Sequence, residues 1–187
     1  MNYWGIGVLH MIRVLERIRA QELPTLFRWF IIYSLMGWIF ETTFCYITSG
    51  NLTKRGFLYG PLIPIYGCCV LIMILVCYNK EDSIISLFVR CAIVATTVEY
   101  MTSFWMERIF DRRWWNYSNI PMNIHGRICL GASVLFGILG ALLIRYVHPR
   151  VMLMSEHISD RALSFFDRAI LVIFLYDILL SVRVTII

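Results

Sequence analysis

The sequence has few charged residues and none of the common nucleotide or hydrolase motifs. Charged side chains make up 16% of its 187 residues, whereas hydrophobic ones make up 59%, with a mean hydropathy of +0.71. A soluble domain of this size could not bury so much apolar surface. The chain also lacks a G-x-x-x-x-G-K-[ST] loop, an H-E-x-x-H helix and a G-x-S-x-G elbow. Hydrolysis of ATP by a P-loop is therefore excluded, and a separate ATPase subunit would have to supply any ATP-driven step.

Metal and disulfide signatures are missing as well. None of the six cysteines forms a C-x-x-C pair, and the four histidines are scattered. We therefore predict no metal site, no disulfide framework and no cofactor. The net charge of +5 comes from arginines in loops and at helix ends, which membrane topology explains better than a nucleic-acid partner.

Five apolar stretches fill the chain, each near the roughly 20 residues needed to cross a bilayer. They run over about 27–48, 61–78, 84–106, 128–147 and 165–184. The sequence therefore predicts an all-α, polytopic integral membrane protein with a single transmembrane domain at 25–187. Counting Lys and Arg in the loops favours the amino terminus inside and the carboxyl terminus outside.

The first 24 residues are predicted to form an amphipathic helix at the membrane interface. Apolar residues recur at steps of three and four from Trp4 to Ile18, with Arg13 and Arg17 on the opposite side. Charges follow the apolar residues, which is the reverse of a signal peptide. The helix is expected to end before Pro24.

Three carboxylates, Glu41, Glu99 and Asp177, lie inside predicted spans. A charged side chain near the bilayer centre costs at least about 2.5 kcal/mol, so each should face a partner, a cavity or a substrate. Glu41 and Glu99 are equally consistent with binding of substrate or protons and with structural ion pairs to Arg55 or Arg127. For Asp177 we favour a structural network with Arg183.

The polar residues converge on one face of the membrane, because the first loop, the third loop and the carboxyl terminus all emerge there. We predict a polar cavity open to this face. Its arginines could hold a phosphate or carboxylate group, or could simply anchor the helices at the interface. Its aromatic residues could cap the cavity or could form an interfacial belt. The candidate binding residues are Glu41, Arg55, Tyr59, Tyr66, Glu99, Trp115, Tyr117, Asn123, Arg127 and Asp177. No catalytic residue is assigned.

A weak internal repeat has an offset of 58 residues. Glu41 matches Glu99, Lys54-Arg55 matches Arg112-Arg113, and Tyr59 matches Tyr117. The pattern suggests a tandem two-helix repeat in parallel orientation, with the fifth span as an addition.

Several motifs resemble one bacterial membrane-protein family. They are GWIFE at 37–41, RGFLYGPLIPIYG at 55–67, VEY at 98–100, RWWNYS at 113–118 and GRICL at 126–130. They resemble the family named "putative ABC-transporter type IV", or CmpB-like, from about residue 28 to the last span. The resemblance implies a permease in the bacterial plasma membrane. It marks as motif positions Glu41, Arg55, Gly60, Pro61, Tyr66, Gly67, Glu99, Tyr117, Gly126 and Arg127.

The combined interpretation is a transporter or permease component that binds a polar or anionic small molecule or lipid. Its expected partners are membrane lipids, a separate ATPase subunit and further copies of the same chain, because five spans make a thin pore wall. One alternative is an enzyme acting on a lipid or isoprenoid phosphate, with Glu41 or Glu99 as general base and Arg55 and Arg127 holding phosphate. Another is a non-catalytic membrane assembly factor.

Overall fold

The structure is a computed structural model that describes residues 23–78, 83–155 and 160–186, without the side chains of 155–164. The amphipathic helix predicted at 1–24 lies outside these residues, except for Leu23 and Pro24. Those two residues already belong to the first described helix, which begins four residues earlier than the span predicted at 27–48.

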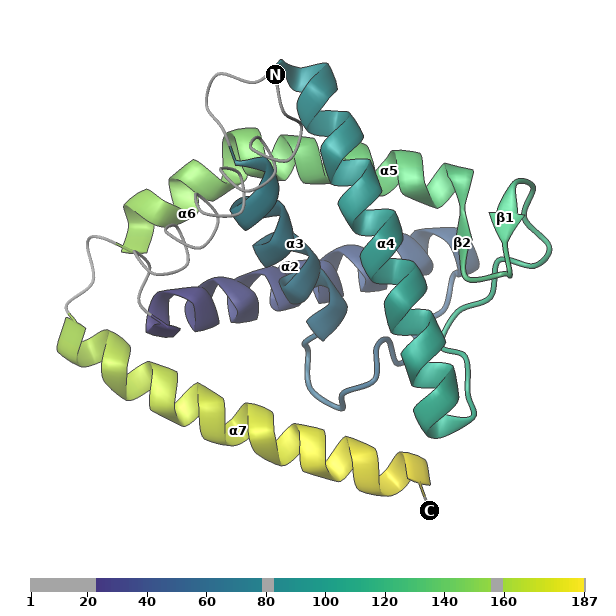
Figure 1. Cartoon of the computed structure of the whole chain (residues 1–187). Helices are drawn as coiled ribbons and strands as arrows, with labels where there is room; N and C mark the ends of the chain where they lie inside the picture. The colour runs from purple at the N-terminus through teal and green to yellow at the C-terminus, as the bar shows by residue number, and fades with distance from the viewer. Residues whose placement is uncertain (1–22, 79–82, 156–159, 187) are drawn as a thin grey trace, which may run out of the picture.

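The described residues form a helical bundle with one small hairpin (Figure 1). In chain order the elements are α2 (Leu23–Ser49), α3 (Pro64–Cys77), α4 (Ile84–Phe110), β1 (Asn123–Ile124), β2 (Ile128–Cys129), α5 (Leu130–Leu142), the π-helical segment η1 (Leu143–Val147), α6 (His148–Ser155) and α7 (Asp160–Ile186). Since α5, η1 and α6 follow one another without a break, they continue one long helical segment.

The helices confirm the predicted class, an all-α polytopic membrane protein. Four helical segments of the described chain are long and apolar enough to cross a bilayer: Leu23–Ser49, Ile84–Phe110, Leu130–Met154 and Phe165–Ile186. They correspond to the first, third, fourth and fifth predicted spans. Each is longer than the hydropathy pattern indicated, because helical hydrogen bonding continues into the polar flanks.

The second predicted span, at 61–78, needs correction. Its helix α3 starts only at Pro64 and has 14 residues, which is about 21 Å of helix and shorter than the roughly 30 Å hydrocarbon core. Residues 50–63 before it are not helical, since Gly56 has a positive φ of 79° and Pro61 and Pro64 interrupt helical hydrogen bonding. Non-helical backbone at this depth must lie against protein.

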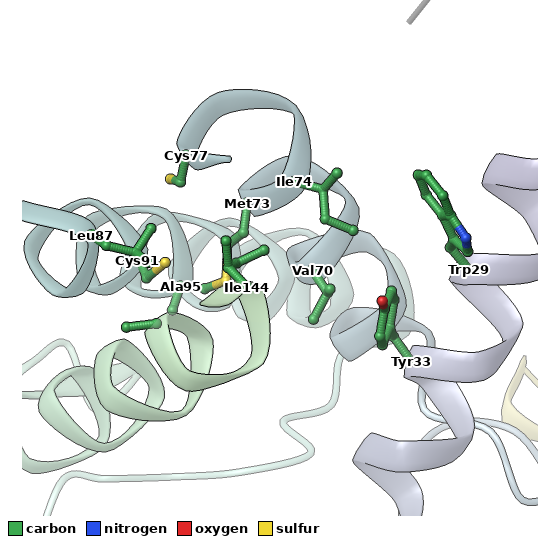
Figure 2. Packing of buried hydrophobic residues seen from close by; sticks show 11 residues of the cluster. Trp29, Tyr33, Val70, Met73, Ile74, Cys77, Leu87, Cys91, Ala95 and Ile144 are labelled. Carbon is green, nitrogen blue, oxygen red and sulfur yellow. The ribbon is translucent and has the colours of Figure 1, made fainter. Parts of the chain in front are cut away.

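The core lies where α2, α3, α4 and η1 meet (Figure 2). On α4 the buried residues recur at every fourth position: Leu87, Cys91, Ala95, Glu99 and Ser103. This stripe continues directly from apolar core residues to Glu99. The carboxylate therefore faces protein rather than lipid, as its insertion cost required.

Small residues let the helices approach closely. A Cβ at Gly67 of α3 would lie 2.6 Å from the carbonyl oxygen of Phe30 in α2, and one at Gly137 of α5 would lie 2.7 Å from Cβ of Ala92 in α4. Close packing at small residues is a main source of helix association in membranes. Gly131 of α5 does not pack in this way, because no neighbouring atom lies within 4 Å of a Cβ placed there.

The last helix, α7, lies along one side of the bundle (Figure 1). Near its start Asp167 forms a bidentate pair with Arg28 of α2, with an Nη2 to Oδ2 distance of 2.7 Å. Phe174 packs edge-on against Phe27 and Phe30. Most other apolar residues of α7, such as Val172 and Leu179, are exposed, which leaves this surface for lipid or for another protein.

Candidate functional site

Two carboxylates, two tyrosines and one arginine come together where the first and third loops meet the bundle. We call Glu41, Arg55, Tyr66, Glu99 and Tyr117 the carboxylate–tyrosine site. The Tyr66 hydroxyl is hydrogen-bonded to Glu41, and the Arg55 guanidinium lies near enough to attract that carboxylate. Tyr66 also lies within electrostatic range of Tyr117 and Glu99, so the two halves of the site adjoin.

Glu99 is the most buried charged residue of this site, with a relative exposure of 7%. Its Oε1 atom accepts a hydrogen bond of 2.9 Å from the Tyr117 hydroxyl. Its Oε2 atom is buried and has no hydrogen-bond partner in the part of the chain that the structure describes. An unpaired oxygen of this kind is costly to bury, so it indicates a missing partner.

Arg55 has an unused donor, whereas Glu99 has an unused acceptor. The Nε atom of Arg55 is also buried and has no hydrogen-bond partner among the described residues. The site thus contains a buried acceptor and a buried donor that protein groups leave unused. Such atoms are normally satisfied by water or by a ligand.

The β1–β2 hairpin positions Tyr117. Asn123 pairs with Cys129 and Ile124 with Ile128, around a turn in which His125 and Gly126 have positive φ angles of 54° and 66°, as a type I′ turn requires. The Gly126 carbonyl accepts a 2.8 Å hydrogen bond from the Tyr117 N–H, which directs the tyrosine toward Glu99.

The Tyr117 hydroxyl acts as a donor. Burial, with the nearby Glu99 charge, raises the pKa of Tyr117 above its usual value. The hydroxyl therefore stays protonated at any physiological pH and can keep donating to the Glu99 carboxylate.

Two further predicted residues hold the third loop, residues 111–129, in place. Trp115 Nε1 donates a 2.9 Å hydrogen bond to the carbonyl of Arg127. Asn123 binds the carbonyl of Ile120 at 2.8 Å through Nδ2 and accepts from the Gly126 N–H at 3.0 Å. These contacts are within the loop itself, so the side chains of Trp115 and Asn123 organise the site rather than complete it.

One of the two alternatives for Glu41 and Glu99 was an ion pair with Arg55 or Arg127. Arg127 forms no such pair with either glutamate. Its Nη2 atom pairs with Glu107 Oε2, and its Nη1 atom donates to Ser103 Oγ at 3.2 Å. The other oxygen of Glu107 pairs with Arg113 Nε at 2.7 Å. Glu107 therefore engages two of the arginines that could have bound an anion.

Removing this shared carboxylate should loosen the third loop. In Glu107→Gln both Arg113 and Arg127 lose their ion pair, so we expect backbone amides at 113–127 to exchange hydrogen at least about ten times faster. Hydrogen–deuterium exchange with mass spectrometry on the protein in detergent measures this. Arg112→Gln, at an exposed position of the same loop, is the control, and unchanged exchange in Glu107→Gln would contradict the proposed role of the pair.

Asp177 binds backbone amides, and the predicted network with Arg183 is wrong. Its Oδ1 atom accepts from the Tyr59 N–H and its Oδ2 atom from the Gly60 N–H, each at 2.9 Å, with a further contact from Ser181 at 3.3 Å. A Cβ at Gly60 would lie 2.9 Å from Asp177 Oδ2, so glycine permits this approach. The Tyr59 ring lies under the Lys54 ammonium at 3.5 Å. The candidate binding residues Asp177 and Tyr59 therefore join α7 to the first loop.

Sequence reasoning missed Glu107, which holds two arginines of the third loop. The sequence carries a signal for it, because Glu99, Ser103 and Glu107 follow at steps of four and lie on one face of α4. Among the described residues no three His, Cys, Asp or Glu side chains group in a way that could hold a metal ion.

The fold and the site define a polytopic helical membrane protein with a buried, charged and incompletely paired group of side chains between its helices. In a comparison with protein families, residues 28–182 match the family described as "Putative ABC-transporter type IV". The chain belongs to that family, as its motifs suggested. Searches of curated proteins and of solved structures gave no match.

Proposed function

We propose that this protein is the membrane component of a transport system in the bacterial plasma membrane, and that it binds a small polar solute at the carboxylate–tyrosine site. The observation that carries the proposal is Glu99, a carboxylate buried among membrane helices with one oxygen left unpaired. A carboxylate in that environment marks a substrate or ion path by default. Membership of an ABC-transporter-related family supports transport as the process.

The arrangement of the arginines favours solute binding over the lipid-phosphate enzyme. That enzyme needs Arg55 and Arg127 together on a phosphate, but Arg127 is paired with Glu107 and Ser103. A lone arginine offers less charge than a phosphate dianion needs. The two carboxylates of the site would in addition repel a phosphate group.

The proposed transport system needs more than a single copy of this chain alone. The helices of one chain make a thin wall, and the apolar face of α7 is largely exposed. We therefore expect lipid and either further copies or a partner subunit around the bundle, with a separate ATPase if the transport is driven by ATP.

The first test is to purify the tagged protein from its native membrane in mild detergent. Mass spectrometry then identifies proteins and small molecules that stay bound. We expect a polar solute at close to one per chain, and a loss of at least about ten-fold in its retention in Glu99→Gln, which keeps the shape but removes the charge. Tyr117 can still donate to the remaining oxygen, so folding should be preserved.

Asp111→Asn is the matched control. Asp111 is an exposed carboxylate at the end of α4 with a φ of 51°, a conformation that asparagine adopts readily. This variant should retain the solute like the unaltered protein. Equal retention in Glu99→Gln, or no polar solute in any preparation, would contradict the proposed function.

A further inference from the structure

The unpaired atoms of the carboxylate–tyrosine site have opposite chemical demands. Glu99 Oε2 needs a donor, and Arg55 Nε needs an acceptor. The two lie on different segments, since Glu99 is on α4 and Arg55 is in the first loop. A ligand that satisfies both atoms must therefore carry a donor at one end and an acceptor at the other.

The tyrosines of the site already have partners. The Tyr117 hydroxyl donates to Glu99 Oε1 at 2.9 Å, and the Tyr66 hydroxyl is hydrogen-bonded to Glu41. Tyr66 and Tyr117 lie within electrostatic range of each other, so the two hydroxyls link the Glu41 half of the site to the Glu99 half. The hydrogen-bonding capacity that the site leaves unused is therefore at Glu99 Oε2 and Arg55 Nε.

A ligand with a single charge would leave one of these ends unsatisfied. A simple cation carries no acceptor for Arg55 Nε, and a simple anion carries no donor for Glu99 Oε2. Because unpaired buried groups cost more than paired ones gain, a site of this kind discriminates strongly against ligands that lack one of the groups.

We propose that the solute of this site is a small zwitterion, with its ammonium group on Glu99 Oε2 and its carboxylate on the Arg55 guanidinium. The proposal rests on the proposed function and names its substrate class. An amino acid or a similar amphoteric molecule has both groups. Its ammonium meets the Glu99 carboxylate and its carboxylate meets the Arg55 guanidinium, which compensates the loss of hydration at both ends. Because a zwitterion has no net charge, the two carboxylates of the site disfavour it less than they disfavour a phosphate dianion.

The test uses the full chain in detergent and two sets of probes. One set is the α-amino acids, and the other is the unbranched ω-amino acids from glycine to 6-aminohexanoate, which act as a ruler between the two ends. Each is compared by isothermal titration calorimetry with the alkylammonium ion and the alkyl carboxylate of the same length. We expect at least one zwitterion to bind at least about ten-fold more tightly than either of its analogues.

Two variants assign the ends of the ligand. Glu99→Gln should bind the best zwitterion no better than its carboxylate analogue, and Arg55→Gln should bind it no better than its ammonium analogue. Asp111→Asn and Arg183→Gln, both at exposed positions, should keep the original preference. If Glu99 and Arg55 had only a structural role, each variant would lower the affinity for all probes together. It would not remove the preference for one end of the ligand alone.

Two results would overturn the proposal that the solute is a zwitterion. The first is an ammonium or carboxylate analogue that binds as tightly as the best zwitterion. The second is that none of the zwitterions tested binds. If the purified protein nevertheless retains another polar solute in a Glu99-dependent way, the proposed function stands and only the substrate class fails. Should a variant fail to fold, the comparison of zwitterions with their analogues on the unaltered protein decides alone.

Discussion

Replacing Gly67 by valine should abolish folded protein. A Cβ at this position of α3 would lie 2.6 Å from the carbonyl oxygen of Phe30, which belongs to the backbone of α2. A backbone atom cannot turn away as a side chain can, so the helices would have to separate. Overpacking of a well-packed interface costs about 3 kcal/mol or more in such a case, and the Tyr66–Glu41 contact beside it would be lost as well.

Size-exclusion chromatography and the thermal midpoint in detergent measure this effect. Gly131→Ala is the control, since nothing lies within 4 Å of a Cβ there. It should leave the midpoint unchanged or raise stability by about 0.5–1 kcal/mol, because alanine favours helix over glycine. If Gly67→Val eluted and unfolded like the unaltered protein, α2 and α3 would not pack as described.

Replacing Asp177 by alanine should release the first loop from α7. The change removes the acceptors of the Tyr59 and Gly60 amides together. Unpaired amides of this kind cost about 1–3 kcal/mol, so we expect a loss of about 2 kcal/mol and a fall in the thermal midpoint of about 4–8 °C for a chain of this length. Faster proteolysis of residues 50–63 should accompany it.

A graded series separates this contact from general effects on α7. Asp177→Asn keeps one acceptor oxygen and should fall between alanine and the unaltered protein. Ser181→Ala removes only the 3.3 Å contact to the same carboxylate and should change the midpoint little. Equal midpoints for alanine and asparagine at position 177 would show that the amide contacts do not stabilise the loop.

The apolar spans could be predicted because they depend on local composition alone. Hydropathy located the helices at 23–49, 84–110, 130–155 and 160–186, although the fourth extends eight residues beyond the end of its predicted span. It overestimated the second span, because Leu62 and Ile63 are apolar whether or not their backbone is helical. Glycine and proline decide the conformation of that segment, and residue hydropathy does not record them.

The partners of the charged residues were harder to predict. Glu41 and Glu99 could be recognised from their depth in the spans, and the proximity of Arg55 to Glu41 agrees with one predicted alternative. Asp177 was paired with Arg183 because both lie on one helix, yet its partners are 117 and 118 residues away. Contacts between residues so far apart in the sequence depend on how the helices pack, and sequence periodicity does not indicate how they pack.

The internal repeat stays a prediction. The carboxylates at the two matching positions each bind a tyrosine hydroxyl, which agrees with a duplication. The tyrosines do not match, however, because Glu41 binds Tyr66 while Tyr59, the counterpart of Tyr117, contributes its backbone N–H to Asp177. If the halves share an origin, their loops have diverged more than their helices.

The contact between Asp177 and the first loop also bears on how the protein is made. Helix α7 is synthesised after α2 and α3, and an aspartate near the middle of a span costs about 2.5–3.5 kcal/mol when the helix enters lipid alone. The amides of Tyr59 and Gly60 offset that cost only if the earlier helices have already been inserted and folded around the first loop. The order of synthesis therefore matches the order of assembly, and a truncated chain that presents α7 without α2 and α3 should leave the translocon poorly integrated.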